Sequence, residues 1–113
     1  MRVLMVEDAT DLAETVSARF ARVGIACDLA ATVTEAEDHL AVQRYDALVL
    51  DINLPDGSGT DLLRRLRGGG DRTPVLMLTA RGDAAAGTSQ ADAVLAKPFA
   101  NEDLRALVRR MLA

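Results

Sequence analysis

Short apolar runs alternate along the chain with stretches whose apolar positions recur every three or four residues. Five runs predict strands, at 3–6, 25–30, 47–50, 75–78 and 94–96. The first run is apolar at every position, which is typical of a strand covered on both faces. The stretches between the runs predict helices. This alternation favours a flavodoxin-like, doubly wound α/β fold, with a five-stranded parallel sheet in the order 2-1-3-4-5 and about five helices.

The predicted helices begin and end at recognisable residues. We expect Asp11 and Glu14 to cap the first helix and Asn101 to cap the last. The sequence Thr-Val-Thr-Glu at 32–35 has the pattern of a capping box, which opens the second helix. Gly24 ends the first helix, because glycine readily adopts the backbone conformation that terminates a helix.

The third and fourth helical stretches differ in quality. In the third, leucines point inward, and we expect a solvated outer face formed by Arg64, Arg65 and Arg67. Three consecutive glycines at 68–70 end it. The stretch 82–89 contains two glycines and no clear apolar stripe, so the helix expected there is short, distorted or mobile.

Composition narrows the class of protein. The 113 residues suit one domain over 1–113, and 50% of them are hydrophobic. A net charge of −4 disfavours direct binding to nucleic acid, which requires a basic face. No apolar run reaches the roughly 20 residues of a membrane helix, and we see no signal peptide, so we expect no membrane association.

The single cysteine, Cys27, favours the reducing cytoplasm. We expect the only histidine, His39, at the surface.

Polar residues follow the predicted strands at the points where the strands end. Glu7 and Asp8 follow the first strand, Asp51 the third, Thr79 the fourth and Lys97 the fifth. Parallel strands end at one edge of their sheet, and ligands bind there, at the point where the strand order reverses. We therefore expect these five side chains to converge.

The converging residues suit phosphoryl chemistry assisted by a metal ion. Three close carboxylates repel one another, and a hard cation removes that conflict. Oxygen ligands without His or Cys favour Mg²⁺. Asp51 is then the natural nucleophile, while Lys97 and Thr79 can bind phosphoryl oxygens.

Each of these residues also has an ordinary structural explanation. An acidic pair after a strand is usually a helix cap or a solvated loop, and Asp51 alone could cap the following turn. Thr79 could be a β-branched strand end, and Lys97 a surface lysine. All five at strand ends of one small domain favour a shared site.

The residues that carry this chemistry match a known family. Over residues 3–112 the chain resembles the receiver domains (CheY-like) of bacterial two-component response regulators. The resemblance rests on Val-Leu-Met-Val-Glu-Asp, on Asp-Ala-Leu-Val-Leu-Asp-Ile-Asn-Leu-Pro-Asp-Gly-Ser-Gly, on Val-Leu-Met-Leu-Thr-Ala-Arg and on Lys-Pro-Phe, at 3–8, 46–59, 75–81 and 97–99. Together these motifs are highly specific.

The resemblance implies a role for each matched position. Asp51 matches the phosphoacceptor. Glu7 and Asp8 match the acidic pair that binds Mg²⁺ with it, and the backbone carbonyl of Asn53 completes the metal site. Thr79 matches the hydroxyl that responds to phosphorylation. Lys97 matches the lysine that contacts the phosphate, and the Lys97–Pro98 bond is often cis in members. Asn53 and Arg81 stand at the two positions that tune dephosphorylation in the family.

The resemblance also implies a function and partners. The phosphoryl donor is a phosphohistidine on a sensor histidine kinase or phosphotransfer protein, which docks on the first helix. Phosphorylation then controls homodimerisation or an attached effector, so the domain is a signalling phosphoacceptor rather than a conventional enzyme. Its self-directed reactions are phosphotransfer and autodephosphorylation. The last helix resembles that of receivers at the N-terminus of OmpR/PhoB-type transcriptional regulators.

Departures from the family keep an alternative open. The stretch between Thr79 and Lys97 is about one helical turn shorter than in typical members. The position that usually holds an aromatic switch residue is Val94. We therefore expect the output to work through ordering of residues 82–93, and a degenerate or stand-alone receiver that serves as an interaction scaffold remains an alternative. A phosphohydrolase is disfavoured because Asn53 stands where its acid–base carboxylate would be.

Overall fold

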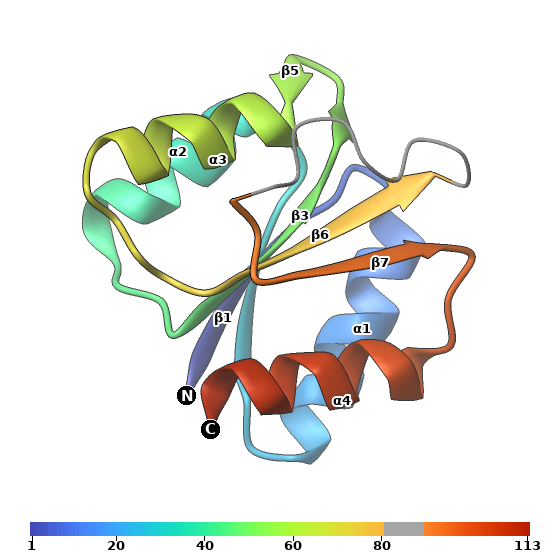
Figure 1. The fold of residues 1–113 in the computed structure, drawn as a ribbon. Coiled ribbons are helices and arrows are strands. Elements are labelled where there is room, and N and C mark those ends of the chain that lie inside the picture. The colour runs from blue at the N-terminus through green and yellow to red at the C-terminus, as the bar shows by residue number, and fades with distance from the viewer. Residues whose placement is uncertain (81–89) are drawn as a thin grey trace.

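A five-stranded parallel sheet forms the centre of the molecule, with strands in the order β2-β1-β3-β6-β7 (Figure 1). The computed structural model describes residues 1–80 and 90–113. Along the chain the elements are β1 (Arg2–Val6), α1 (Thr10–Arg22), β2 (Ala26–Ala30), α2 (Val33–Val42), β3 (Ala47–Asp51), β4 (Asn53–Leu54), β5 (Gly57–Ser58), α3 (Gly59–Gly68), β6 (Val75–Ala80), β7 (Ala93–Lys97) and α4 (Asn101–Leu112). The strand order confirms the predicted doubly wound fold.

Helices cover both faces of the sheet, α1 and α4 on one and α2 and α3 on the other (Figure 1). Successive strand residues point to opposite faces, so β1 sends Val3 and Met5 into one core and Leu4 and Val6 into the other. This is why the central strands read as unbroken apolar runs. All four side chains are fully buried.

The described residues contain four helices. The additional helix predicted over 82–89 lies outside the described residues, as does most of the 82–93 stretch in which we expected reordering. Within 1–80 and 90–113 no helix is both long and apolar enough to span a bilayer.

Two of the predicted helix caps are wrong. The residue before α1 is Ala9 and the residue before α4 is Ala100, and neither helix has a side-chain cap. Asp11 and Asn101 lie inside the first turns instead, where a backbone carbonyl from an extended alanine opens each helix. The cap of α2 is confirmed, because the Thr32 hydroxyl accepts the N–H of Glu35 at 3.0 Å.

Arg67 corrects the prediction of a wholly solvated arginine face on α3. Arg64 and Arg65 are exposed, but the Arg67 side chain is only 7% exposed. It donates to the carbonyls of Asp71 and Thr73, both at 2.9 Å, and to that of Gln90 at 3.2 Å, and it pairs with Asp92 at 3.2 Å. Asp92 also accepts the N–H of Val75. Arg67 therefore ties the end of α3 to the starts of β6 and β7.

A cluster of polar residues lies near the edge of the sheet where the strands begin, which we call the amino edge. Asp28 accepts hydrogen bonds from Arg2 at 3.0 Å and from the Tyr45 hydroxyl at 2.6 Å. His39 Nδ1 lies 3.4 Å from the same hydroxyl and is half-buried, which corrects the expected solvated position. Cys27 is half-buried against the core on the other face of the sheet, and burial raises the pKa of its thiol to about 11.

Candidate functional site

The five polar residues predicted to converge all lie at the edge where the parallel strands end, which we call the carboxyl edge. Glu7 directly follows β1, Asp51 ends β3, Thr79 lies next to the end of β6 and Lys97 ends β7. Glu7, Asp51 and Thr79 are buried, whereas Asp8 is exposed. The strand order reverses between β1 and β3, which are neighbours in the sheet, so the ends that carry Glu7 and Asp51 lie side by side.

Three carboxylates form a compact acidic cluster at this edge. One oxygen from each of Glu7, Asp8 and Asp51 lies within 4.8 Å of the others. The cluster consists of hard oxygen donors, one of them exposed, so an ion can approach from solvent and retain water ligands. The donor set therefore fits a hard divalent cation.

Lys97 lies against two of these carboxylates. Its ammonium donates to Asp51 Oδ2 at 2.8 Å and also to Glu7 Oε1. Burial raises the pKa of Glu7, although the hydrogen bond from Lys97 opposes that rise. Burial alone would lower the pKa of Lys97, but its hydrogen bonds to Asp51 and Glu7 outweigh that effect and raise it. Lys97 therefore remains a cation beside the Asp51 carboxylate.

Thr79 contributes a buried hydroxyl at the same edge. Its Oγ1 is inaccessible to solvent and has no hydrogen-bond partner in the part of the chain that the structure describes. A buried hydroxyl without a partner is unfavourable, and most such groups in proteins are satisfied. An oxygen of a bound anion would satisfy it.

Backbone groups hold the carboxylates in place. The N–H of Ala9 donates to Glu7 Oε2 and the N–H of Asn53 donates to Asp51 Oδ1, both at 3.2 Å. Gly59 packs so tightly that a Cβ there would lie 2.1 Å from the Asp51 carbonyl oxygen. The parts played by Ala9 and Gly59 are not among the predictions from sequence, although glycine can mark a close approach of two backbone segments.

Residues around the site match the resemblance in one respect and depart from it in another. The Lys97–Pro98 peptide bond is cis. Val94, in the position of the aromatic switch residue, is 39% exposed on β7. Asn53 is exposed, and Arg81 lies outside the described residues.

Comparisons with known proteins agree with this geometry. Residues 3–109 match the family described as "Response regulator receiver domain", a family of signalling domains. The transcriptional regulatory protein PmrA of Pectobacterium parmentieri is 40% identical over 99% of this chain and 52% of its own length. The chain thus spans about half the length of the curated relatives it matches.

Solved structures share the fold over nearly the whole chain. The receiver domain of Francisella response regulator 1452 has a TM-score of 0.92 and 29% identity, covering 98% of this chain and 95% of that one. The response regulator TrrA of Thermotoga maritima, in complex with Mg(2+)-BeF, has a TM-score of 0.87 and 27% identity, covering 98% of each chain. Because the family match covers residues 3–109, almost the whole chain, this chain belongs to the response regulator receiver domains.

Proposed function

We propose that residues 1–113 act as one receiver domain, a phosphoacceptor switch in two-component signal transduction. Asp51 takes a phosphoryl group from a phosphohistidine on a sensor histidine kinase or phosphotransfer protein. The observation that supports this most is the convergence of Glu7, Asp8 and Asp51, with the Lys97 ammonium 2.8 Å from Asp51 Oδ2. As for other members of the family, the proposed place of action is the cytoplasm.

Mg²⁺ is the proposed cofactor. Carboxylates of Glu7, Asp8 and Asp51, together with the backbone carbonyl of Asn53, would hold it. When bound, the ion neutralises negative charge that would otherwise keep a phosphoryl group away from a carboxylate. The relative TrrA, solved in complex with Mg(2+)-BeF, supports this choice of ion.

The protein residues have distinct parts in the transfer. A carboxylate oxygen of Asp51 forms a bond to phosphorus while the phosphorus–nitrogen bond of the phosphohistidine breaks, and the electron pair of that bond returns to the imidazole. Lys97 can hold one phosphoryl oxygen through its ammonium group. The Thr79 hydroxyl, without a partner among the described residues, can donate to another. Hydrolysis of the acyl phosphate by water later restores Asp51.

The proposed output is a change in partner or dimer interactions. The curated relatives include a transcriptional regulatory protein, and we propose that this receiver likewise regulates transcription, through an output module and with a homodimer formed on phosphorylation. We propose no direct contact of residues 1–113 with nucleic acid, since their net charge is −4.

Intact mass spectrometry tests the proposal. The chain is incubated with acetyl phosphate and Mg²⁺, and we expect it to gain one phosphoryl group. Asp51→Asn should gain none, and omission of Mg²⁺ should abolish the gain in the wild type. Asp38→Asn, which changes an exposed carboxylate on α2, is the matched control and should react normally. Absence of any gain in the wild type would reject the phosphoacceptor function and favour a scaffold.

A further inference from the structure

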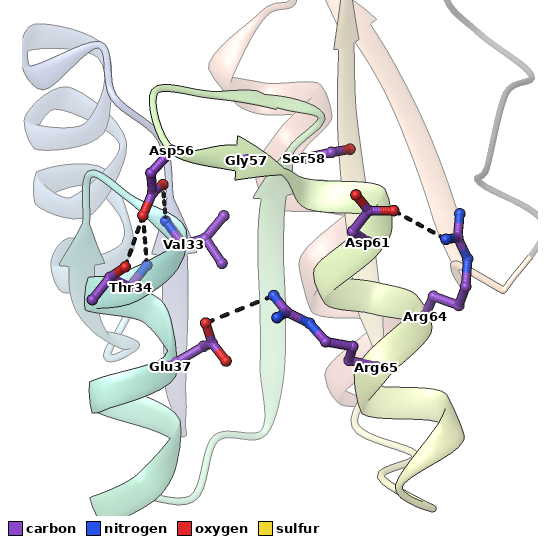
Figure 2. Close-up of a pocket in the computed structure, with 9 residues that line it drawn as sticks. All are labelled: Val33, Thr34, Glu37, Asp56, Gly57, Ser58, Asp61, Arg64 and Arg65. Carbon is purple, nitrogen blue, oxygen red and sulfur yellow. Dashed lines mark hydrogen bonds and ion pairs between the residues drawn. The ribbon is translucent and has the colours of Figure 1, made fainter.

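One side chain attaches the β4–β5 hairpin to the beginning of α2. Asp56 lies in the turn of the hairpin, and its carboxylate accepts the N–H groups of Val33 at 2.7 Å and Thr34 at 3.1 Å, and the Thr34 hydroxyl at 2.8 Å (Figure 2). The first N–H groups of a helix have no partner within the helix and favour a negative charge. These hydrogen bonds lower the pKa of Asp56, so it is a carboxylate at neutral pH.

The attachment is more than a helix cap. α2 already has its own cap, the Thr32 hydroxyl, which accepts the N–H of Glu35. Asp56 comes from a distant part of the chain, and Gly57 beside it packs against Val33, where a Cβ would lie 3.4 Å from Val33 Cγ2. Two side chains therefore cap the same end of α2. Of these two, Asp56 is the one that connects the helix to another element.

Asp56 provides the side-chain hydrogen bonds that hold the hairpin, while Leu54 packs against the core on that face of the sheet. A pocket of about 460 Å³ lies between α2, the hairpin and α3 (Figure 2). The charged side chains that line the pocket form ion pairs with each other, Arg65 with Glu37 at 3.7 Å and Arg64 with Asp61 at 3.0 Å. Among the described residues, Asp56 is the one side chain of 53–58 that hydrogen-bonds outside the 51–60 segment.

The other end of the hairpin leads to the acceptor carboxylate. Asn53 pairs with Ser58 across the hairpin, and the Asn53 N–H donates to Asp51 Oδ1 at 3.2 Å. Directly after the hairpin, the Gly59 N–H donates to the Ile52 carbonyl at 2.8 Å. The position of the hairpin thus fixes the backbone that orients the Asp51 carboxylate.

We propose that Asp56 is a positioning residue for the metal site: by tying the hairpin to α2, it holds the Asn53 backbone against the Asp51 carboxylate. The inference rests on the proposed function, because it concerns the affinity of the same site for Mg²⁺. It assigns α2 a part in the site, although no residue of α2 touches the acidic cluster.

Titration calorimetry with MgCl₂ measures the effect directly, without requiring phosphorylation. We expect Asp56→Ala to bind Mg²⁺ roughly tenfold more weakly than the wild type, as for loss of other groups that orient metal ligands. Asp56→Asn keeps one acceptor oxygen and loses the other, so its affinity should lie between the two. Urea unfolding of each variant records the accompanying change in stability.

Thr32→Ala is the matched control, because it removes the other cap of α2 and leaves the hairpin attached. It should lose stability but bind Mg²⁺ like the wild type. Unchanged affinity in Asp56→Ala, or an equal loss in Thr32→Ala, would overturn the inference. If Asp56→Ala does not fold, Asp56→Asn compared with Thr32→Ala decides in the same way. Failure of the wild type itself to bind Mg²⁺ would reject the proposed function instead.

Discussion

Single polar residues in this molecule are buried in two different ways. Glu7 is buried with the half-buried Lys97 as its ion-pair partner. Thr79 is buried without a hydrogen-bond partner in the described part of the chain. Removing either partner of the ion pair would leave the other charge unpaired, which destabilises the folded chain. The second arrangement costs stability, and under the proposed function a phosphoryl oxygen would satisfy the hydroxyl.

Replacing Thr79 with valine tests this cost. Valine has nearly the same shape and no polar atom, so we expect the free energy of unfolding to stay equal or to rise by about 1 kcal/mol. Urea denaturation at neutral pH measures it. Thr73→Val is the control, because the Thr73 hydroxyl donates to Asp71 at 2.6 Å and its loss should cost about 1 kcal/mol. A loss of stability in Thr79→Val as large as that of the control would contradict the prediction.

Asp28 makes stability depend on pH at the amino edge. The hydrogen bond from Tyr45, with Arg2 nearby, holds the pKa of Asp28 below its usual value. A carboxylate whose pKa is lower in the folded chain stabilises that chain at neutral pH. This contribution is complete above the usual pKa of about 4 and is lost as the pH falls through the lowered value.

Tyr45→Phe removes the main cause of this shift. We expect the variant to be about 1 kcal/mol less stable at neutral pH, because the hydroxyl no longer donates to the carboxylate. As the pH falls from about 5 to about 2, the stabilities of the two proteins should converge, since protonated Asp28 holds the hydroxyl more weakly. Urea unfolding across this range is the measurement. A difference that does not change with pH would argue against a role for Asp28.

At the scale of elements, one arginine joins three of them. Arg67 leaves the last turn of α3 and donates to carbonyl groups that precede β6 and β7. Its guanidinium can serve several acceptors at once because its donors are arranged as a planar fork. The short connection after α3 is therefore held by a side chain rather than by secondary structure.

Arg67→Met keeps most of the side-chain stem and removes these donors. We expect it to lower the free energy of unfolding by about 2 kcal/mol, because the half-buried carbonyls of Asp71 and Thr73 lose their partner. Arg64→Met, on the exposed face of the same helix, should change it by less than about 0.5 kcal/mol. Denaturant unfolding compares them, and equal effects of the two substitutions would show that Arg67 has no special part.

The strands and the site could be predicted from sequence more accurately than the helix ends. Burial on both faces produces an unbroken apolar run, which locates a strand, and the rule that ligands bind at strand ends located the acidic cluster. The caps predicted for α1 and α4 were wrong because an aspartate or asparagine signals a cap only if the backbone turns there, and these helices open on Ala9 and Ala100 instead. The contacts of Asp56 and Arg67 depend on residues that only the fold brings near.

At the scale of the whole molecule, the doubly wound sheet separates stability from chemistry. Two cores lie on the two faces of the sheet, and the candidate site lies at its carboxyl edge. Arg2 and Tyr45, which hold Asp28, lie towards the opposite edge, where β1 and β3 begin. A ligand that binds only the folded chain nevertheless stabilises the whole domain, because unfolding must release it.

Mg²⁺ should raise the stability of the entire chain. At a concentration ten times the dissociation constant, linkage predicts about 1.4 kcal/mol, provided that the unfolded chain does not bind the ion. Thermal unfolding with MgCl₂ and with EDTA measures the effect as a rise in Tm. Asp8→Asn should lose most of the rise, whereas Asp38→Asn, outside the cluster, should keep it. An identical rise in both variants would point to a non-specific effect of salt.

Both ends of the chain lie away from the carboxyl edge (Figure 1). Met1 precedes the start of β1, and α4 runs back from the end of β7 towards the amino edge. An affinity tag or a fluorophore joined at either terminus would therefore stand a full strand length from the carboxylates. The domain can be tethered to a sensor surface by either end, which leaves the carboxyl edge facing the solution that flows past.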